Sequence, residues 1–256
     1  MSLGEHLVEL RNRLMIGAAG ILLGTVAGFF LYDLVWPILS NPVTVLSEAK
    51  KNSVSINFAG IATAFDVRFQ VALAIGIVIS SPIWLLQIFG FLTPGLTKTE
   101  KRYVFGFFFS AVPLFLAGCT AGFYVMPHIV ELMASFVPAN GTTFFDAKYF
   151  LDFILKLVLA TGVAFVLPVF LVLLNFAGIL RGKSILKGWR WAILAITLFT
   201  AAATPAADLF SMFLLAVPMV ALYFGAVGLA LLHDRSVDRK TAAAIAGTDA
   251  GLPAGA

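Results

Sequence analysis

The sequence predicts an all-α, polytopic membrane protein with about six transmembrane helices, the last two of them short, and with both termini in the cytoplasm. Of its 256 residues, 61% are hydrophobic and only 12% are charged, whereas soluble domains average about 45–50% apolar and about 25% charged residues. The apolar residues are gathered into long runs, and lipid requires no polar cover over them. These observations place the chain in a bilayer.

Six apolar segments pass or approach the length of about 20 residues that a helix needs to cross the hydrocarbon core. They cover 14–36, 69–92, 104–127, 150–177, 190–204 and 209–231. The first follows the helical pattern HLVELRNRL, so we expect a mature helix rather than a cleaved signal. Between the last two, Pro205 and Asp208 interrupt the apolar pattern. Because one helix across both would exceed a bilayer at about 1.5 Å per residue, we predict a hairpin of two short helices.

The positions of Lys and Arg predict the orientation of these spans. One set of connections carries most of the basic residues, namely Arg11, Arg13, Lys98, Lys101, Arg102, Arg181, Lys183, Lys187, Arg190, Arg235, Arg239 and Lys240. The opposite connections, 37–68 and 128–149, carry only Lys50, Lys51, Arg68 and Lys148. We therefore expect 93–103 and 178–190 to be cytoplasmic, and the two long connections to be outside. Their apolar residues predict that they pack into a cap.

The chain is expected to form one domain with a tail. Residues 1–240 make a single transmembrane domain, and 241–256 is a low-complexity cytoplasmic segment of small residues that is expected to be disordered. The basic residues form short clusters between spans and not a continuous stripe, which argues against nucleic-acid binding. Cys119 is the only cysteine, so the chain has no intramolecular disulfide and no zinc site of the CxxC kind.

Motifs of enzymes are missing from the sequence. It contains no HExxH, no GxSxG and no phosphate-binding loop, and His6, His128 and His233 lie near three different span ends. We therefore predict a protein that is not an enzyme and that needs neither a metal nor a cofactor.

Acidic residues near the membrane are more informative, because an ionisable group close to hydrocarbon is costly and often marks a pathway or a partner. Glu9 lies one turn before the first span, and Glu100 lies in the short connection after the second. Spacing alone favours a structural explanation for both. Glu9 precedes Arg13 by four residues, which is an ordinary helical pair, and Glu100 is surrounded by the basic residues of 98–102.

Two other acids have structural explanations as well. Asp152 precedes Lys156 by four residues in the fourth span, so an ion pair on the helix surface is expected. Asp208 stands directly before the last span, where its carboxylate can cap the helix by accepting backbone N–H bonds.

Three blocks of the sequence resemble the TatC component of the twin-arginine protein translocase. The first block contains His6, Leu7, Glu9, Leu10, Arg11 and Arg13. The second, at 80–102, contains Pro82, Gln87, Phe91, Pro94, Glu100 and Arg102. The third, at 203–219, has a Thr-Pro turn followed by Asp208 and a last span that contains proline.

The resemblance implies a receptor without enzymatic activity in the inner (plasma) membrane, which binds the twin-arginine signal peptides of folded proteins. It also implies homo-oligomers, TatA- and TatB-type single-span partners and export driven by the proton-motive force. Glu9 and Glu100 match the family's positions for signal recognition, with Arg11, Arg13 and Arg102 beside them. Structural or partner-contact roles are expected for Pro37, Pro82, Gln87, Pro94 and Asp208. A carboxylate suits this ligand, since it pairs in a planar, bidentate manner with guanidinium and not with lysine.

One position departs from the family pattern. The family commonly carries an intramembrane Glu in the fourth span, and Val166 stands there in this chain. Two alternatives remain open beside the receptor. Composition alone would suit a small-molecule or ion transporter, although such proteins usually show midplane charges or internal repeats. A membrane scaffold would differ from the receptor only in whether Glu9 and Glu100 contact a ligand.

Overall fold

The computed structural model describes residues 3–49, 54–91, 98–137, 143–204 and 208–249, with the backbone alone described at 98–105 and 240–249 and at residues 3, 49, 54 and 143. Almost all of this is helical, and the order of elements is α1 (Leu3–Ala49), β1 (Val54–Asn57), α2 (Thr63–Ile79), α3 (Ser81–Phe91), α4 (Lys98–Ser135), β2 (Thr143–Asp146), α5 (Ala147–Phe176), α6 (Gly182–Lys187), α7 (Trp189–Ala203) and α8 (Leu209–Asp249). The predicted all-α fold class is confirmed.

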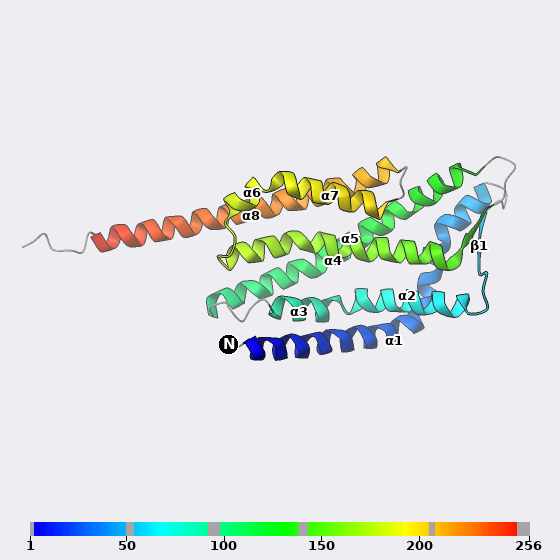
Figure 1. Ribbon diagram of the computed structural model, residues 1–256, viewed down its shortest axis with the longest axis horizontal. Coiled ribbons are helices and arrows are strands. Elements are labelled where there is room, and N and C mark those ends of the chain that lie inside the picture. Colours follow the sequence, from blue (N-terminus) through cyan, green and yellow to red (C-terminus); the bar gives the residue numbers. More distant parts are fainter. Residues whose placement is uncertain (1–2, 50–53, 92–97, 138–142, 205–207, 250–256) are drawn as a thin grey trace, which may run out of the picture.

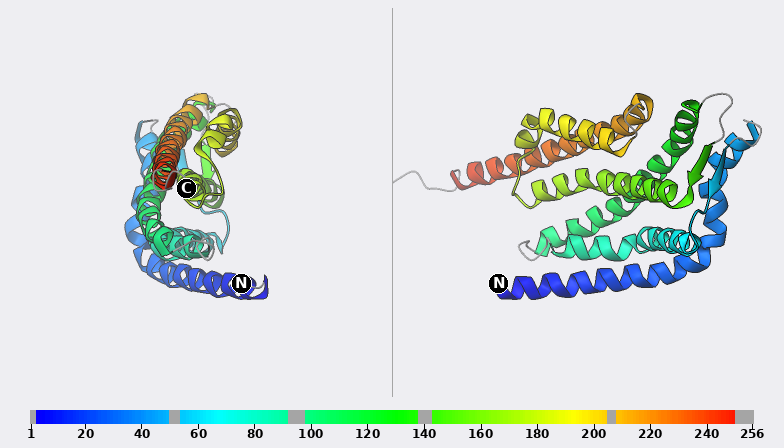
Figure 2. Two further views of the ribbon diagram at one scale, coloured as in Figure 1. Left: turned by 90° about the vertical axis from the view of Figure 1, so that its left-hand side faces the viewer. Right: turned by 45° about the vertical axis from the view of Figure 1, so that its right-hand side comes forward.

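The long helices lie side by side in a curved layer. Contacts connect α1 with α2 and α3, α3 with α4, α4 with α5, α5 with α8, and α8 with α7, and the end-on view in Figure 2 shows the layer bending into an arc. The start of α1 and the end of α8 lie at one end of the molecule, and the two strands lie at the other (Figure 1). The two ends of the described chain therefore lie at one end of the molecule, as the six predicted spans require.

Each of the six predicted spans coincides with an apolar helix or helix pair. Among the described residues, α1, α4, α5 and α8 each contain a stretch that is long and apolar enough to cross a membrane, and α2 and α3 pass the same test together. The sixth element, α7, is a shorter apolar helix of 15 residues. Length and composition thus agree with the prediction, while the number of crossings stays a prediction.

The last helix is longer than predicted. The predicted span 209–231 forms its apolar part, but α8 has 41 residues and ends at Asp249. The sequence explains this length, because no Gly or Pro occurs between Gly228 and Lys240 to interrupt the helix. The helix backbone thus reaches into the segment predicted to be a tail. Residues 250–256 lie outside the described residues, and the boundary at residue 240 stays a prediction.

The two outer connections are shorter than predicted, because the helices before them continue into 37–68 and 128–149. Helix α1 continues to Ala49 with Pro37 and Pro42 inside it, and α4 continues to Ser135. Packing compensates for the hydrogen bonds that the two prolines remove, since Leu39 and Val43 are buried against Val67 and Val71 of α2. The prolines therefore bend this helix (Figure 1) instead of ending it.

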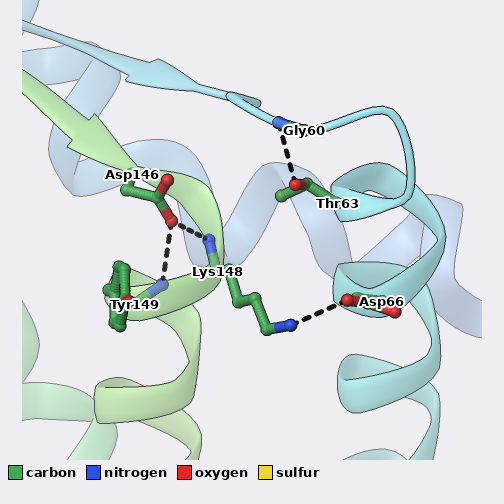
Figure 3. Close-up of polar contacts among 6 residues, drawn as sticks. All are labelled: Gly60, Thr63, Asp66, Asp146, Lys148 and Tyr149. Carbon is green, nitrogen blue, oxygen red and sulfur yellow. Dashed lines mark hydrogen bonds and ion pairs between the residues drawn. The ribbon is translucent and has the colours of Figure 1, made fainter.

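The expected cap exists at the strand end of the molecule. Strand β1 pairs in parallel with β2, with Asn57 opposite Asp146. Asp146 then caps α5 by accepting hydrogen bonds from the backbone N–H groups of Lys148 (2.9 Å) and Tyr149 (3.2 Å). Lys148 reaches across to the Asp66 carboxylate of α2 at 2.8 Å, as Figure 3 shows. The cap thereby fixes the start of α2 relative to the start of α5.

The predicted second span, 69–92, is broken into two helices. Helices α2 and α3 meet at an angle of 57°. Pro82 lies in the first turn of α3 and has no N–H to donate to the preceding turn, which favours a break at this position. The indole N–H of Trp84 donates to the carbonyl oxygen of Ile77 at 2.9 Å, so one carbonyl at the break regains a partner. This satisfies a polar group that lipid could not.

Glycines set the distance between the first two helices. A Cβ atom on Gly24 would lie 2.6 Å from the carbonyl oxygen of Gly76, and one on Gly28 would collide with the carbonyl oxygen of Ala72. A similar contact joins α4 to α5, where the hydroxyl of Thr161 donates to the carbonyl oxygen of Gly118 at 3.0 Å. Small residues of this kind let helix backbones approach closely within a membrane.

Val166 is buried inside the protein. Its side chain is 2% exposed and belongs to an apolar cluster formed by α3, α4 and α5. Phe89, Phe115 and Leu173 are members of the same cluster. The position that carries an acid in the resembling family is therefore filled here by close apolar packing and not by a lipid-facing side chain.

We expect Gly24→Ala to lower the stability of the detergent-solubilised protein by about 1–3 kcal/mol, since the new methyl group meets backbone that cannot yield. The measurement is thermal unfolding followed by intrinsic fluorescence. Gly225→Ala is the matched control, because a Cβ there meets nothing within 4 Å. Equal melting temperatures for the two variants would contradict the proposed close contact of α1 with α2.

Val166→Glu should destabilise the protein by several kcal/mol, roughly 3 or more, because it places a carboxylate without a partner in an apolar cluster. Val166→Ile adds one methylene and should cost only about 1–3 kcal/mol by overpacking. Thermal unfolding of both variants in the same detergent tests this. A Glu variant as stable as the parent would show that water or a polar partner reaches the cluster.

Candidate functional site

Near the N-terminal end of α1, Glu9 and Arg13 form a salt bridge. The guanidinium of Arg13 donates from Nε and Nη2 to the same Glu9 oxygen, Oε1, at 2.9 and 2.7 Å. The side chains are 27% (Arg13) and 22% (Glu9) exposed. The predicted helical pair is confirmed, and the second oxygen, Glu9 Oε2, has less than 1 Å² of exposed surface and no hydrogen-bond partner among the described residues.

The end of α3 packs against this pair. Gly90 lies beside the Arg13 guanidinium, and a Cβ atom at position 90 would collide with Nη1 of that group. One turn earlier on α1, the His6 ring stacks on Phe91 with 4.4 Å between the ring centroids. The position of α3 therefore determines where the Arg13 side chain can lie.

Two neighbouring hollows meet at Arg13 and Gln87. The first has a volume of about 400 Å³ and is lined by Glu5, Val8, Glu9, Asn12, Arg13, Ile16 and Gln87. The second has a volume of about 450 Å³ and is lined by Leu10, Arg13, Leu14, Gly17, Ala18, Ile21, Trp84, Gln87, Ile88 and Phe91. A hollow with two carboxylates thus adjoins an almost wholly apolar groove, which suits a ligand with a cationic head and an apolar continuation.

The structure brings together only some of the predicted site residues. Arg11 is exposed, donates to Asn12 Oδ1 at 3.4 Å, and does not line either hollow. Glu100 and Arg102 lie in the first turns of α4, but their side chains are outside the described ones, and Pro94 lies outside the described residues altogether. The predicted approach of Glu100 to Glu9 therefore stays a prediction.

Two predicted structural residues do not line either hollow. Pro37 is in the part of α1 that packs under the cap. Asp208 caps α8, since its Oδ1 accepts a hydrogen bond from the Ser211 N–H at 2.9 Å. This is the contact predicted from the sequence. The predicted surface pair is present as well, with Lys156 Nζ 2.6 Å from an Asp152 oxygen.

Sequence reasoning missed three residues that the structure places at the site. Glu5 and Asn12 line the same hollow as Glu9, and Gly90 accommodates Arg13. Glu5 and Asn12 had a signal in the sequence, because they lie four residues before and three residues after Glu9 on one helix face. Gly90 had no such signal, since its role depends on the contact between two helices. Among the described residues, no cluster of His, Cys, Asp and Glu could hold a metal ion.

Comparisons with known proteins point to one family. A sequence profile described as Sec-independent protein translocase protein (TatC) matches residues 5–218. A protein of that description from Xylanimonas cellulosilytica is 46% identical over 246 residues, which cover 96% of this chain and 89% of the relative. Another, from Rothia mucilaginosa, is 35% identical over 250 residues, which cover 97% of this chain and 85% of the relative.

The fold agrees with this family. A crystal structure of the twin arginine translocase receptor TatC in DDM superposes with a TM-score of 0.75 at 27% identity, covering 88% of this chain and 99% of that one. The resemblance predicted from three sequence blocks is therefore confirmed. This chain belongs to the TatC family of Sec-independent protein translocase proteins.

Proposed function

We propose that this protein is the receptor subunit of a twin-arginine translocase and binds twin-arginine signal peptides at its cytoplasmic face. One observation carries the proposal. Glu9 already holds a guanidinium group, that of Arg13, by two hydrogen bonds in a hollow at the end of α1. The site thus has a carboxylate that accepts a guanidinium group. In the Arg13 pair both hydrogen bonds go to one oxygen, and a carboxylate can also bind a guanidinium through two parallel hydrogen bonds, a geometry that lysine cannot reproduce.

The neighbouring groove supports the same ligand. A signal peptide has a positively charged region followed by about 7–15 apolar residues. The acidic hollow and the apolar groove between α1 and α3 adjoin in the same way, with Arg13 and Gln87 lining both. We propose that the arginines occupy the hollow with Glu9 and Glu100 as their acceptors, while the apolar region of the peptide follows the groove.

Partners and energy source belong to the same proposal. Large apolar side chains are exposed on several helices, including Leu22, Phe30, Phe109, Leu167, Leu198 and Leu229. Such surfaces suit lipid, other copies of this chain and single-span proteins of the TatA and TatB type. Family membership supports a location in the inner membrane, cytoplasmic termini and export driven by the proton-motive force. The same membership disfavours the small-molecule transporter, and a scaffold without signal binding is tested below.

The proposed orientation predicts which positions an impermeant thiol reagent can reach in intact cells. In a Cys119→Ala background, a cysteine at position 50 should be labelled and one at position 98 should not, because basic connections stay inside. Labelling after cell lysis provides the control for the reactivity of position 98. Labelling at 98 but not at 50 in intact cells would reverse the orientation and place the acidic hollow on the wrong side.

Glu100→Gln should weaken binding of a twin-arginine signal peptide by roughly ten- to hundredfold, since hydrogen bonds to charged groups contribute about 1.5–3 kcal/mol. Glu9→Gln should act more mildly because Arg13 already shares that carboxylate. If both acids hold one motif, the double variant should cost less than the sum of the single changes. Binding is measured on purified protein with Arg-Arg and Lys-Lys versions of one peptide.

Asp238→Asn is the matched control for these variants. It removes one negative charge from the exposed part of α8 that follows the apolar span, and it should leave peptide binding unchanged. All variants should reach parental levels in the membrane, because each change keeps the size and polarity of the side chain. Should Glu100→Gln bind the Arg-Arg peptide as well as the parent does, the recognition site must lie elsewhere.

A further inference from the structure

The guanidinium group of Arg13 binds Glu9 in the way that an arginine of the proposed signal peptide would. Both of its hydrogen bonds go to one oxygen, Glu9 Oε1. The other oxygen, Oε2, is covered and has no hydrogen-bond partner among the described residues. In this arrangement neither oxygen of Glu9 is open to a new donor. A peptide arginine can therefore bind Glu9 only after Arg13 or the carboxylate has moved.

The surroundings of Arg13 permit such a movement. Its guanidinium lies over Gly90 of α3, where any larger residue would take its place. Arg13 also lines both hollows, so spaces of about 400 and 450 Å³ adjoin it. The side chain can leave Glu9 along the helix surface without disturbing the apolar core. The pair is only partly buried, since about a quarter of each side chain is exposed.

We propose that Arg13 is a built-in competitor for Glu9, and that an arginine of the signal peptide displaces it on binding. This inference rests on the proposed function and adds a residue that sets affinity. Because one guanidinium replaces another at the carboxylate, binding loses the free energy of the Arg13–Glu9 pair. A fully exposed helical ion pair contributes little, whereas a charge-assisted pair that is partly buried contributes more. For the partly exposed Arg13–Glu9 pair, the lost free energy corresponds to about a two- to tenfold lower affinity for the peptide.

The competitor affects affinity and not the preference for arginine over lysine. Every ligand that uses Glu9 must displace Arg13 and loses the same free energy, whereas specificity depends on a difference between two ligands. The geometry of the carboxylate still discriminates between the two side chains.

The opposite role for Arg13 makes the opposite prediction. If Arg13 served to position Glu9 for the ligand, its removal would weaken binding. A general electrostatic effect makes a third prediction, because removal of any nearby positive charge would strengthen binding of a cationic peptide, whether or not Glu9 is present. A double-mutant cycle between positions 9 and 13 separates these three possibilities.

The experiment measures the dissociation constant of one Arg-Arg signal peptide for purified parent, Arg13→Gln, Glu9→Gln and the double variant. We expect Arg13→Gln to bind about threefold more tightly than the parent, and this gain to disappear in the Glu9→Gln background. Arg235→Gln, an exposed arginine on α8, is the control for charge and should bind as the parent does. Size-exclusion chromatography monitors folding of each variant.

Gly90→Ala provides a second test that keeps every charge. Its methyl group occupies the space of Arg13 Nη1 and should displace the guanidinium, so binding should again become tighter. Weaker peptide binding by Arg13→Gln than by the parent would overturn the proposed competition. So would a gain in affinity of the same size when Arg13→Gln is combined with Glu9→Gln, or when Arg235→Gln is made instead. If Glu9→Gln does not change binding at all, the proposed function fails at this residue as well. If Glu9→Gln weakens peptide binding but Arg13→Gln binds with the affinity of the parent, only the proposed competition by Arg13 is disproved and the proposed function stands.

Discussion

The close approach of α1 to the broken helix pair α2–α3 is the constraint on which the site depends. One face of α1 carries Gly17, Gly20, Gly24 and Gly28, and Arg13 continues this face toward the N-terminus. A Cβ would collide with backbone at Gly28 and would lie 2.6 Å from backbone at Gly24, but the nearest atom to a Cβ on Gly17 is 3.6 Å away. The helices therefore diverge toward the N-terminal end of α1. That divergence provides the room in which a guanidinium and two hollows fit.

The break between α2 and α3 adjusts this geometry. The two helices meet at an angle of 57°, and both contact α1. Lipid cannot hydrogen-bond to the carbonyl groups that such a break exposes, so a break is stable only where other groups satisfy them. Trp84 does this with its indole N–H, and its backbone also forms part of the wall facing Gly17. The same few residues thus stabilise the break and shape the groove.

Sequence patterns predicted what depends on composition and on local spacing. The apolar runs located the long helices and α7, but they did not predict the short helix α6 or the division of the second run into α2 and α3. The Glu9–Arg13 and Asp152–Lys156 pairs followed from i, i+4 spacing, and the cap at Asp208 followed from its place before the last apolar run. Features that depend on contacts between helices were not predicted. Pro37 lies inside a helix because distant side chains pack on the turns after it. The role of Gly90 likewise requires knowledge of which α1 side chain faces it.

Val166 shows how packing and function constrain each other in this chain. A carboxylate in the fourth span would need a partner or water, and the cluster around Val166 offers aromatic and aliphatic side chains instead. Among the described side chains, the acids that line a hollow beside α3 are Glu5 and Glu9. Both lie near the N-terminal end of α1. On this part of the protein, the carboxylates therefore lie in a surface hollow and not in the apolar cluster. Apolar packing in the interior fixes the positions of the helices that form this hollow.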